Sequence, residues 1–260
     1  MNFTSNQLRD FSTLFSRSEV NRWLKGDFNS IDIKLERYNL IEKNKGNSYL
    51  KFLRNTYHIL EKNYPNEYVL KNEFLNKWLK KELGTNNSKV FEIKTILDKE
   101  YRLSNQIQEY RKIFNEVYII VPDVLLTKYS NYDESIGIIT FDSNSKNFKI
   151  VQRAKRNKEL NPETLMEVLH TKEYLEITEE YYEQLPQMNS FNQFEICKGL
   201  ISKIPQKELN DLFLSKMKKR KINNHFFNKV NNEFNQICLS LNLKKEERDN
   251  LINSLKTNTI

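Results

Sequence analysis

The hydrophobic period of the chain changes near residue 90, and this change most constrains the fold. From Val90 to Lys94 apolar and polar residues alternate, which predicts a β-strand. Helical spacing returns from Lys99 to Phe114, and the apolar run Val117 to Val121 predicts a second, buried strand. A crossover of this kind returns the second strand parallel to the first, so both strands are expected in one sheet.

Two more strands are expected at Ser135 to Phe141 and Phe148 to Val151, joined as a hairpin by the turn-forming residues 142–145. Helical periodicity dominates the rest of the chain, and the amphipathic pattern from Tyr68 to Leu83 predicts a helix that ends at Gly84. We therefore expect an α/β (α+β) fold with a mixed sheet core at 65–155. A helical N-terminal region at 1–64 and a helical C-terminal region at 156–260 flank this core.

Composition narrows the functional classes. Lysine and arginine total 42 against 34 acidic residues, a net charge of +8, which is compatible with nucleic acid as a partner and equally with a solvated, lysine-rich surface. With only five glycines, a glycine-rich nucleotide-binding loop of the Rossmann or P-loop kind is not expected. The two cysteines lack the spacing of a zinc site. No apolar run approaches the roughly 18 residues that span a bilayer, so we expect a cytoplasmic protein without a membrane partner.

Glu92 and Lys94 form the first candidate for chemistry. Because strand side chains alternate, both project from the same face of the predicted strand. A carboxylate that binds a hard cation and an ammonium that steadies a water or phosphate are the groups that metal-assisted phosphodiester hydrolysis requires. The alternative interpretation is a solvated ion pair on an exposed strand.

The helix after this strand carries a second candidate group. Arg102, Gln106 and Tyr110 are spaced four residues apart and therefore lie along one stripe of the helix. The alternative is that Tyr110 belongs to the core and Gln106 is a solvated neighbour. The order of the two groups along the chain favours a common site.

Glu92-x-Lys94 followed by Gln106-x-x-x-Tyr110 resembles the PD-(D/E)xK nuclease superfamily, in the branch of RecB and lambda exonuclease. The chain is also similar, from Gln7 to Arg220, to a bacterial and phage family of nuclease-like proteins. The resemblance implies a restriction-endonuclease-like fold and a magnesium-dependent (or manganese-dependent) nuclease. It implies these site residues: catalytic Glu92, Lys94, Gln106 and Tyr110, and metal-binding Glu67 and Glu92, with Glu73 as a competitor of Glu67.

One element of that superfamily is missing. Relatives place two strands, with a metal-binding Asp, before the Glu-x-Lys strand, whereas here few residues separate Gly84 from Val90. Asp98 is the other local acid, and we expect it to orient Arg102. Two main hypotheses stay open: a metal-dependent nuclease acting on DNA, in phage defence or mobile-element biology, and a degenerate pseudo-nuclease that binds nucleic acid or a protein. A third is an interaction protein that uses its helical flanks.

A basic run at Met217 to Lys221 is the sharpest charge cluster of the chain. Such a run is either a solvated helix end or a contact to phosphates. The residues expected to bind nucleic acid are Arg102, Lys218, Lys219, Arg220 and Lys221.

Overall fold

A four-stranded mixed sheet lies at the centre of the chain. The computed structural model describes residues 3–79, 87–98, 100–220 and 229–260. The strands are β1 (Lys89–Ile93), β2 (Glu116–Pro122), β3 (Gly137–Asp142) and β4 (Asn147–Gln152), in the order β1-β2-β3-β4. β1, β2 and β3 are parallel and β4 is antiparallel to β3, so the predicted crossover and hairpin are confirmed.

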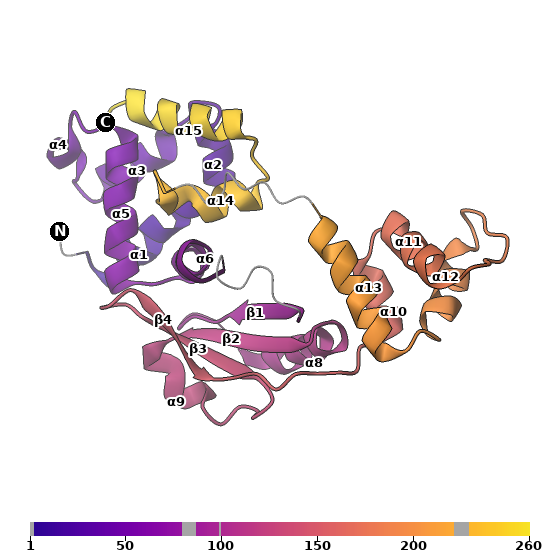
Figure 1. Ribbon diagram of the computed structural model, residues 1–260. Helices are drawn as coiled ribbons and strands as arrows, with labels where there is room; N and C mark the ends of the chain where they lie inside the picture. The colour runs from indigo at the N-terminus through magenta and orange to yellow at the C-terminus, as the bar shows by residue number, and fades with distance from the viewer. Residues whose placement is uncertain (1–2, 80–86, 99, 221–228) are drawn as a thin grey trace.

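Helices cover both faces of the sheet (Figure 1). The crossover helix α8 (Leu103–Ile113) follows the turn η3 (Glu100–Arg102) and packs Leu103 and Ile107 on one face, against Ile119. α6 (Glu67–Phe74) packs Phe74 on the other face, against Tyr118 and neighbouring apolar residues. The mixed α/β class expected from the sequence is therefore confirmed.

Gly137 lets the Tyr118 ring and the backbone at Ala154 lie close to β3. It pairs with Tyr118 in the β2–β3 register, and a Cβ atom built on it would lie 2.1 Å from Cδ1 of Tyr118 and 2.9 Å from the backbone nitrogen of Ala154. No larger residue fits there without moving the backbone.

The first helices of the chain share one core with two helices that come much later. Figure 1 shows the C-terminal helices, in yellow, against the indigo N-terminal ones. Buried residues from both groups form one cluster, including Phe11, Trp23, Leu251 and Leu255. The cluster includes residues of α6, Tyr68 and Val69. The other contributing elements are α1 (Ser5–Ser12), η1 (Thr13–Phe15), α2 (Arg17–Trp23), α3 (Asn29–Arg37), α4 (Ile41–Asn44), α5 (Tyr49–Asn63), η6 (Asn232–Phe234), α14 (Asn235–Ser240) and α15 (Lys245–Thr257).

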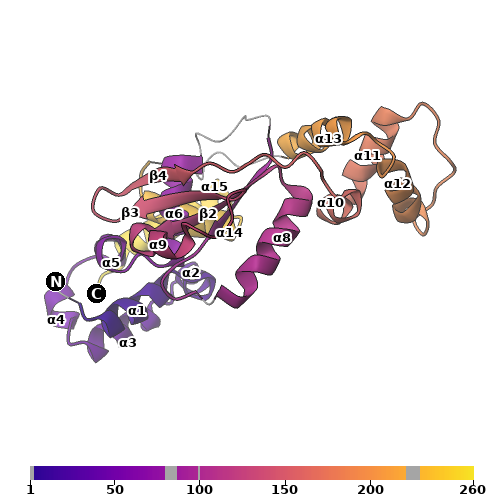
Figure 2. The ribbon, with the colours of Figure 1, turned by 90° about the horizontal axis from the view of Figure 1, so that it is seen from below.

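A separate helical unit extends from the sheet. It consists of α10 (Pro162–Val168), α11 (Thr171–Tyr181), α12 (Gln193–Ile201) and α13 (Gln206–Lys219), with its own buried cluster. In Figure 2 these helices lie beyond the end of α8, at one end of an elongated molecule. The expected C-terminal region 156–260 thus contributes to two different cores.

Short helical elements follow α6 and β2. α6 continues into a π-helical turn, η2 (Leu75–Leu79), and β2 is followed by η4 (Asp123–Leu125) and α9 (Leu126–Tyr129). The helix end predicted at Gly84 lies outside the described residues. Within the described ranges, no helix combines the length and apolar character that crossing a bilayer demands.

Candidate active site

The Glu-x-Lys pair lies at the carboxyl end of β1, at one edge of the sheet. The Lys94 N–H donates to the carbonyl of Ile120 at 2.9 Å, which continues the strand pairing by one residue. Because Phe91 and Ile93 pack toward α6 and Val90 packs toward α8, alternation directs Glu92 and Lys94 to the α8 face. In parallel sheets, ligand sites commonly form beyond this end of the strands.

All four residues predicted to be catalytic are joined by direct contacts. The Lys94 Nζ atom lies 2.9 Å from Oε1 of Glu92 and donates a hydrogen bond of 3.0 Å to Oε1 of Gln106. The Tyr110 hydroxyl donates to Oε2 of Glu92 at 3.0 Å. The strand residues predicted by alternation and the helix residues predicted by four-residue spacing therefore form one polar network.

This network is largely shielded from water. The Lys94 side chain is 7% exposed and that of Glu92 is 16% exposed, so the ion pair sits where screening is weak. Burial raises the pKa of Tyr110 to about 12, with further contributions from the charge of Glu92 and its hydrogen bond. Tyr110 therefore stays a neutral hydrogen-bond donor at physiological pH.

A pocket of about 330 Å³ opens next to the network. Arg102 lies at this pocket with an exposed side chain, and its guanidinium carbon lies 5.1 Å from the ring centroid of Tyr101. Within the described ranges, Arg102 makes no ion pair with a carboxylate. The pocket lining is Glu67, Glu92, Ile93, Lys94, Asp98, Tyr101, Arg102 and Gln106.

The structure separates the two candidates for the first acidic position. Glu67, in the first turn of α6, lines the pocket and pairs with Lys71. Glu73 is buried elsewhere, where it accepts a hydrogen bond of 2.6 Å from Tyr57 and pairs with Lys77. Glu67 is therefore the glutamate that shares the pocket with Glu92.

Asp98 has a different role from the one expected. Its Oδ2 atom accepts hydrogen bonds from the backbone nitrogen and the hydroxyl of Thr95, at 2.6 and 2.8 Å. The carboxylate thus fixes the turn after β1 and does not pair with Arg102.

The glutamate that the resemblance assigns to magnesium already has protein partners. Magnesium binds carboxylate oxygens directly, and Lys94 and Tyr110 each engage one oxygen of Glu92. In the part of the chain that the structure describes, no group of three or more acidic, histidine or cysteine side chains is placed to hold a metal ion.

The predicted nucleic-acid-binding residues divide into different environments. Lys218 and Lys219 are exposed on α13 and line a groove of about 970 Å³, whereas Arg102 lies at the Glu92 pocket. Arg220 donates to both carboxylate oxygens of Glu173, at 2.7 and 2.6 Å, and is committed to this contact. Lys221 lies outside the described residues.

A charged cluster around His58 was not predicted from the sequence. The ring lies 3.4 Å from oxygens of both Glu61 and Glu233, and hydrogen bonds to Glu233 and then Glu61 raise the pKa of His58 to about 9. Glu233 also accepts a hydrogen bond of 2.9 Å from Nε of Arg54. Because Glu233 is distant in sequence, spacing could not have revealed it.

Comparison with known proteins places the chain in a phage family. The family model described as Bacteriophage P4 protein cII matches residues 57–243. The chain belongs to this family. The match contains the whole sheet, α8 and α10 to α13, so both the Glu92 pocket and the groove at Lys218 lie in the cII family region. No curated protein and no solved structure matches the chain.

Proposed function

We propose that this cII family protein is a nuclease-like protein that binds nucleic acid, with DNA as the expected partner, and has lost hydrolytic activity. The observation that carries the proposal is the engagement of Glu92. Lys94 and Tyr110 occupy both of its oxygens, so the carboxylate that would hold a metal in an active PD-(D/E)xK enzyme is committed to protein contacts.

The relationship to PD-(D/E)xK nucleases is supported by order and geometry together. Glu92 and Lys94 lie on a strand, Gln106 and Tyr110 lie on the next helix, and the four side chains contact one another. The described strands pair β1 with β2 alone, which fits a fold in which the preceding acidic strand is missing. The phage named in the family description supports a role in phage defence or mobile-element biology.

Metal-dependent hydrolysis is the second candidate, and one observation favours it. Glu67 and Asp98 share the pocket with Glu92, and carboxylate oxygens are the ligands that magnesium and manganese prefer. Activity would require Glu92 to turn an oxygen away from Lys94 or Tyr110 and toward the pocket.

One experiment separates the two candidates. Labelled single- and double-stranded DNA and RNA are incubated with the protein in Mg²⁺, Mn²⁺ or EDTA, and both retention and product length are measured. The variants are Glu92→Gln and Lys94→Met. Glu109→Gln is the matched control, because Glu109 is an exposed α8 carboxylate paired with Lys112.

We expect retention of nucleic acid by the wild type and no product with either metal. A metal-dependent product that disappears in Glu92→Gln and Lys94→Met, but persists in Glu109→Gln, would establish hydrolysis instead. If the wild type neither retains nor cuts any of the four substrates, both candidates are wrong and a protein partner becomes the leading hypothesis.

A further inference from the structure

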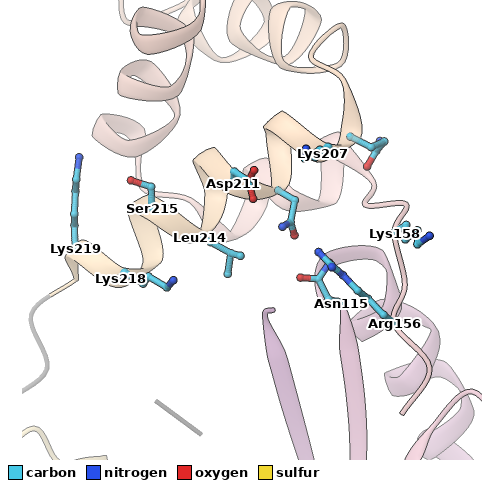
Figure 3. A pocket seen from close by; sticks show the side chains of 11 residues that line it. Asn115, Arg156, Lys158, Lys207, Asp211, Leu214, Ser215, Lys218 and Lys219 are labelled. Atoms are coloured by element: carbon cyan, nitrogen blue, oxygen red, sulfur yellow. The ribbon is translucent and has the colours of Figure 1, made fainter. Parts of the chain in front are cut away.

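A groove lies between α13 and the segment that follows β4. Its volume is about 970 Å³. Figure 3 shows Arg156 and Asn115 facing the side of α13 that carries Leu214 and Lys218. The groove lies beyond the end of α8, since Asn115 follows that helix whereas Gln106 of the Glu92 pocket lies near its start. From Gln106 to Ile113, the last residue of α8, the helix rises roughly 11 Å, and the two sites share no lining residue, so the groove is distinct from that pocket.

Positive charge dominates the lining. Five exposed cationic side chains border the groove, against the single acid Asp211: Arg156, Lys158, Lys207, Lys218 and Lys219. Lys219 lies 3.7 Å from Glu180, while the other four make no ion pair with a carboxylate of the described ranges. Exposed cations without partners attract a polyanion and release its counterions when it binds.

The cations are spread out and do not form a single cluster. Lys207 lies in the first turn of α13 and Lys218 in its last turn, which separates them by about 16 Å along the helix. A nucleic acid strand carries a phosphate every ~3.4 Å along a duplex axis, so the two lysines suit phosphates several nucleotides apart on one strand.

Asn210 gives the groove a neutral recognition group. The residue is 5% exposed and lines the groove, yet its Oδ1 atom has no hydrogen-bond partner among the described residues. The amide of Asn115, which also lines the groove, has partners for both its oxygen and its nitrogen: it accepts from Ser88 and donates to the carbonyl of Asn157. An amide offers a donor and an acceptor side by side, which is the pattern that pairs with the edge of a nucleobase.

We propose that this groove binds single-stranded nucleic acid, with phosphates along Lys207 and Lys218 and one unpaired base at Asn210. A duplex keeps its bases inside its own grooves, so a protein reads them with a projecting helix or ribbon. A concave groove with a buried amide instead receives a base that is free to leave the stack. The inference rests on the proposed function in one respect, that the ligand is nucleic acid, and it adds the place and the strandedness.

The test measures fluorescence anisotropy of a labelled 15-nucleotide single strand with the full chain, over a series of salt concentrations. Lys207→Glu/Lys218→Glu is compared with Lys25→Glu/Lys149→Glu, a control with the same change of net charge at exposed lysines away from the groove. We expect Kd to rise about tenfold or more in the groove variant and the salt slope to fall by about 1.4, for two phosphate contacts on a single strand. The control keeps the wild-type slope.

Asn210→Leu tests the base contact. Leucine is close in size to asparagine and removes the unpaired amide, so the thermal unfolding temperature is expected to be unchanged. Affinity is expected to fall about tenfold, the cost of losing one hydrogen-bonded contact to a base. Thermal unfolding of each variant confirms that it is folded.

Several outcomes would overturn the inference. They are wild-type affinity in the Lys207→Glu/Lys218→Glu variant, tighter binding of a duplex of the same sequence, equal competition by adenosine monophosphate, and equal competition by polyglutamate. If the wild type binds DNA but the groove variant binds equally well, the groove assignment fails and the proposed function stands. If the wild type binds no nucleic acid, both fail.

Discussion

The hydroxyl of Tyr110 lies 3.0 Å from Oε2 of Glu92, a hydrogen bond that joins α8 to β1 across 18 residues of sequence. Together with the Lys94 ammonium on the other oxygen, it holds the glutamate between two protein donors. The contact fixes the crossover helix on the strand edge as much as it shapes the pocket, and stability and chemistry are therefore linked at this position.

Removal of Glu92 is expected to destabilise the fold more than removal of the whole ion pair. Glu92→Ala leaves the Lys94 ammonium, 7% exposed, without its counter-charge, and we expect the free energy of unfolding to fall by about 3 kcal/mol. Glu92→Ala/Lys94→Met is expected to recover at least half of this loss. Urea unfolding of the two single variants and the double variant measures the coupling, and strictly additive effects would contradict it.

His58 is expected to make stability depend on pH. Its pKa is raised from 6.5 to about 9, so its contribution is fully present below pH 6.5 and is lost as pH rises through 9. His58→Gln should therefore be less stable than the wild type at pH 6, with the difference shrinking toward pH 10. Urea unfolding at several pH values checks this, and a difference that does not vary with pH would exclude the ion pairs with Glu61 and Glu233 as the cause.

Gly137 is expected to be intolerant of any side chain. Gly137→Ala would place a methyl group 2.1 Å from the Tyr118 ring, and overpacking of this kind costs about 1 to 3 kcal/mol. Gly199→Ala is the matched control, because this helical glycine has no atom within 4 Å of the new Cβ, and it is expected to be neutral or stabilising. Thermal unfolding compares the two, and equal effects would argue against the close contact.

Arg220 and Lys218 are expected to behave in opposite ways although they belong to the same basic run. Arg220→Gln removes the clamp that lowers the pKa of Glu173 to about 2, and we expect a loss of about 1 kcal/mol in unfolding free energy without a change in affinity for a single strand. Lys218→Gln should weaken binding and leave stability intact. A loss of affinity in Arg220→Gln, with stability retained, would reverse the assignment.

Local pattern accounts for much of the core and of the Glu92 site. The alternation at residues 90–94 and the four-residue spacing of Gln106 and Tyr110 each depend on neighbours in sequence, so they predicted the strand, the helix and the convergence of Glu92 with Lys94. Both periods are set by the backbone itself, and packing did not alter them here.

Contacts between segments distant in sequence could not be predicted from residue spacing. The commitment of Arg220 to Glu173 joins residues 47 apart, and the groove gathers Arg156, Lys158 and Lys207 from separate segments. Sequence spacing does not encode contacts between such distant segments.

The error at Asp98 is local. Its carboxylate accepts hydrogen bonds from the backbone N–H and hydroxyl of Thr95, three residues away, in place of the expected pair with Arg102 four residues on.

The shared core of the first and last helices has a consequence for synthesis on the ribosome. Leu251 and Leu255 of α15 pack in the same buried cluster as Phe11 and Trp23. During synthesis the N-terminal helices therefore keep part of their apolar surface uncovered while the sheet emerges and its strands pair. We therefore expect the amino-terminal helices of the nascent chain to stay accessible to chaperones and proteases until α15 has left the exit tunnel.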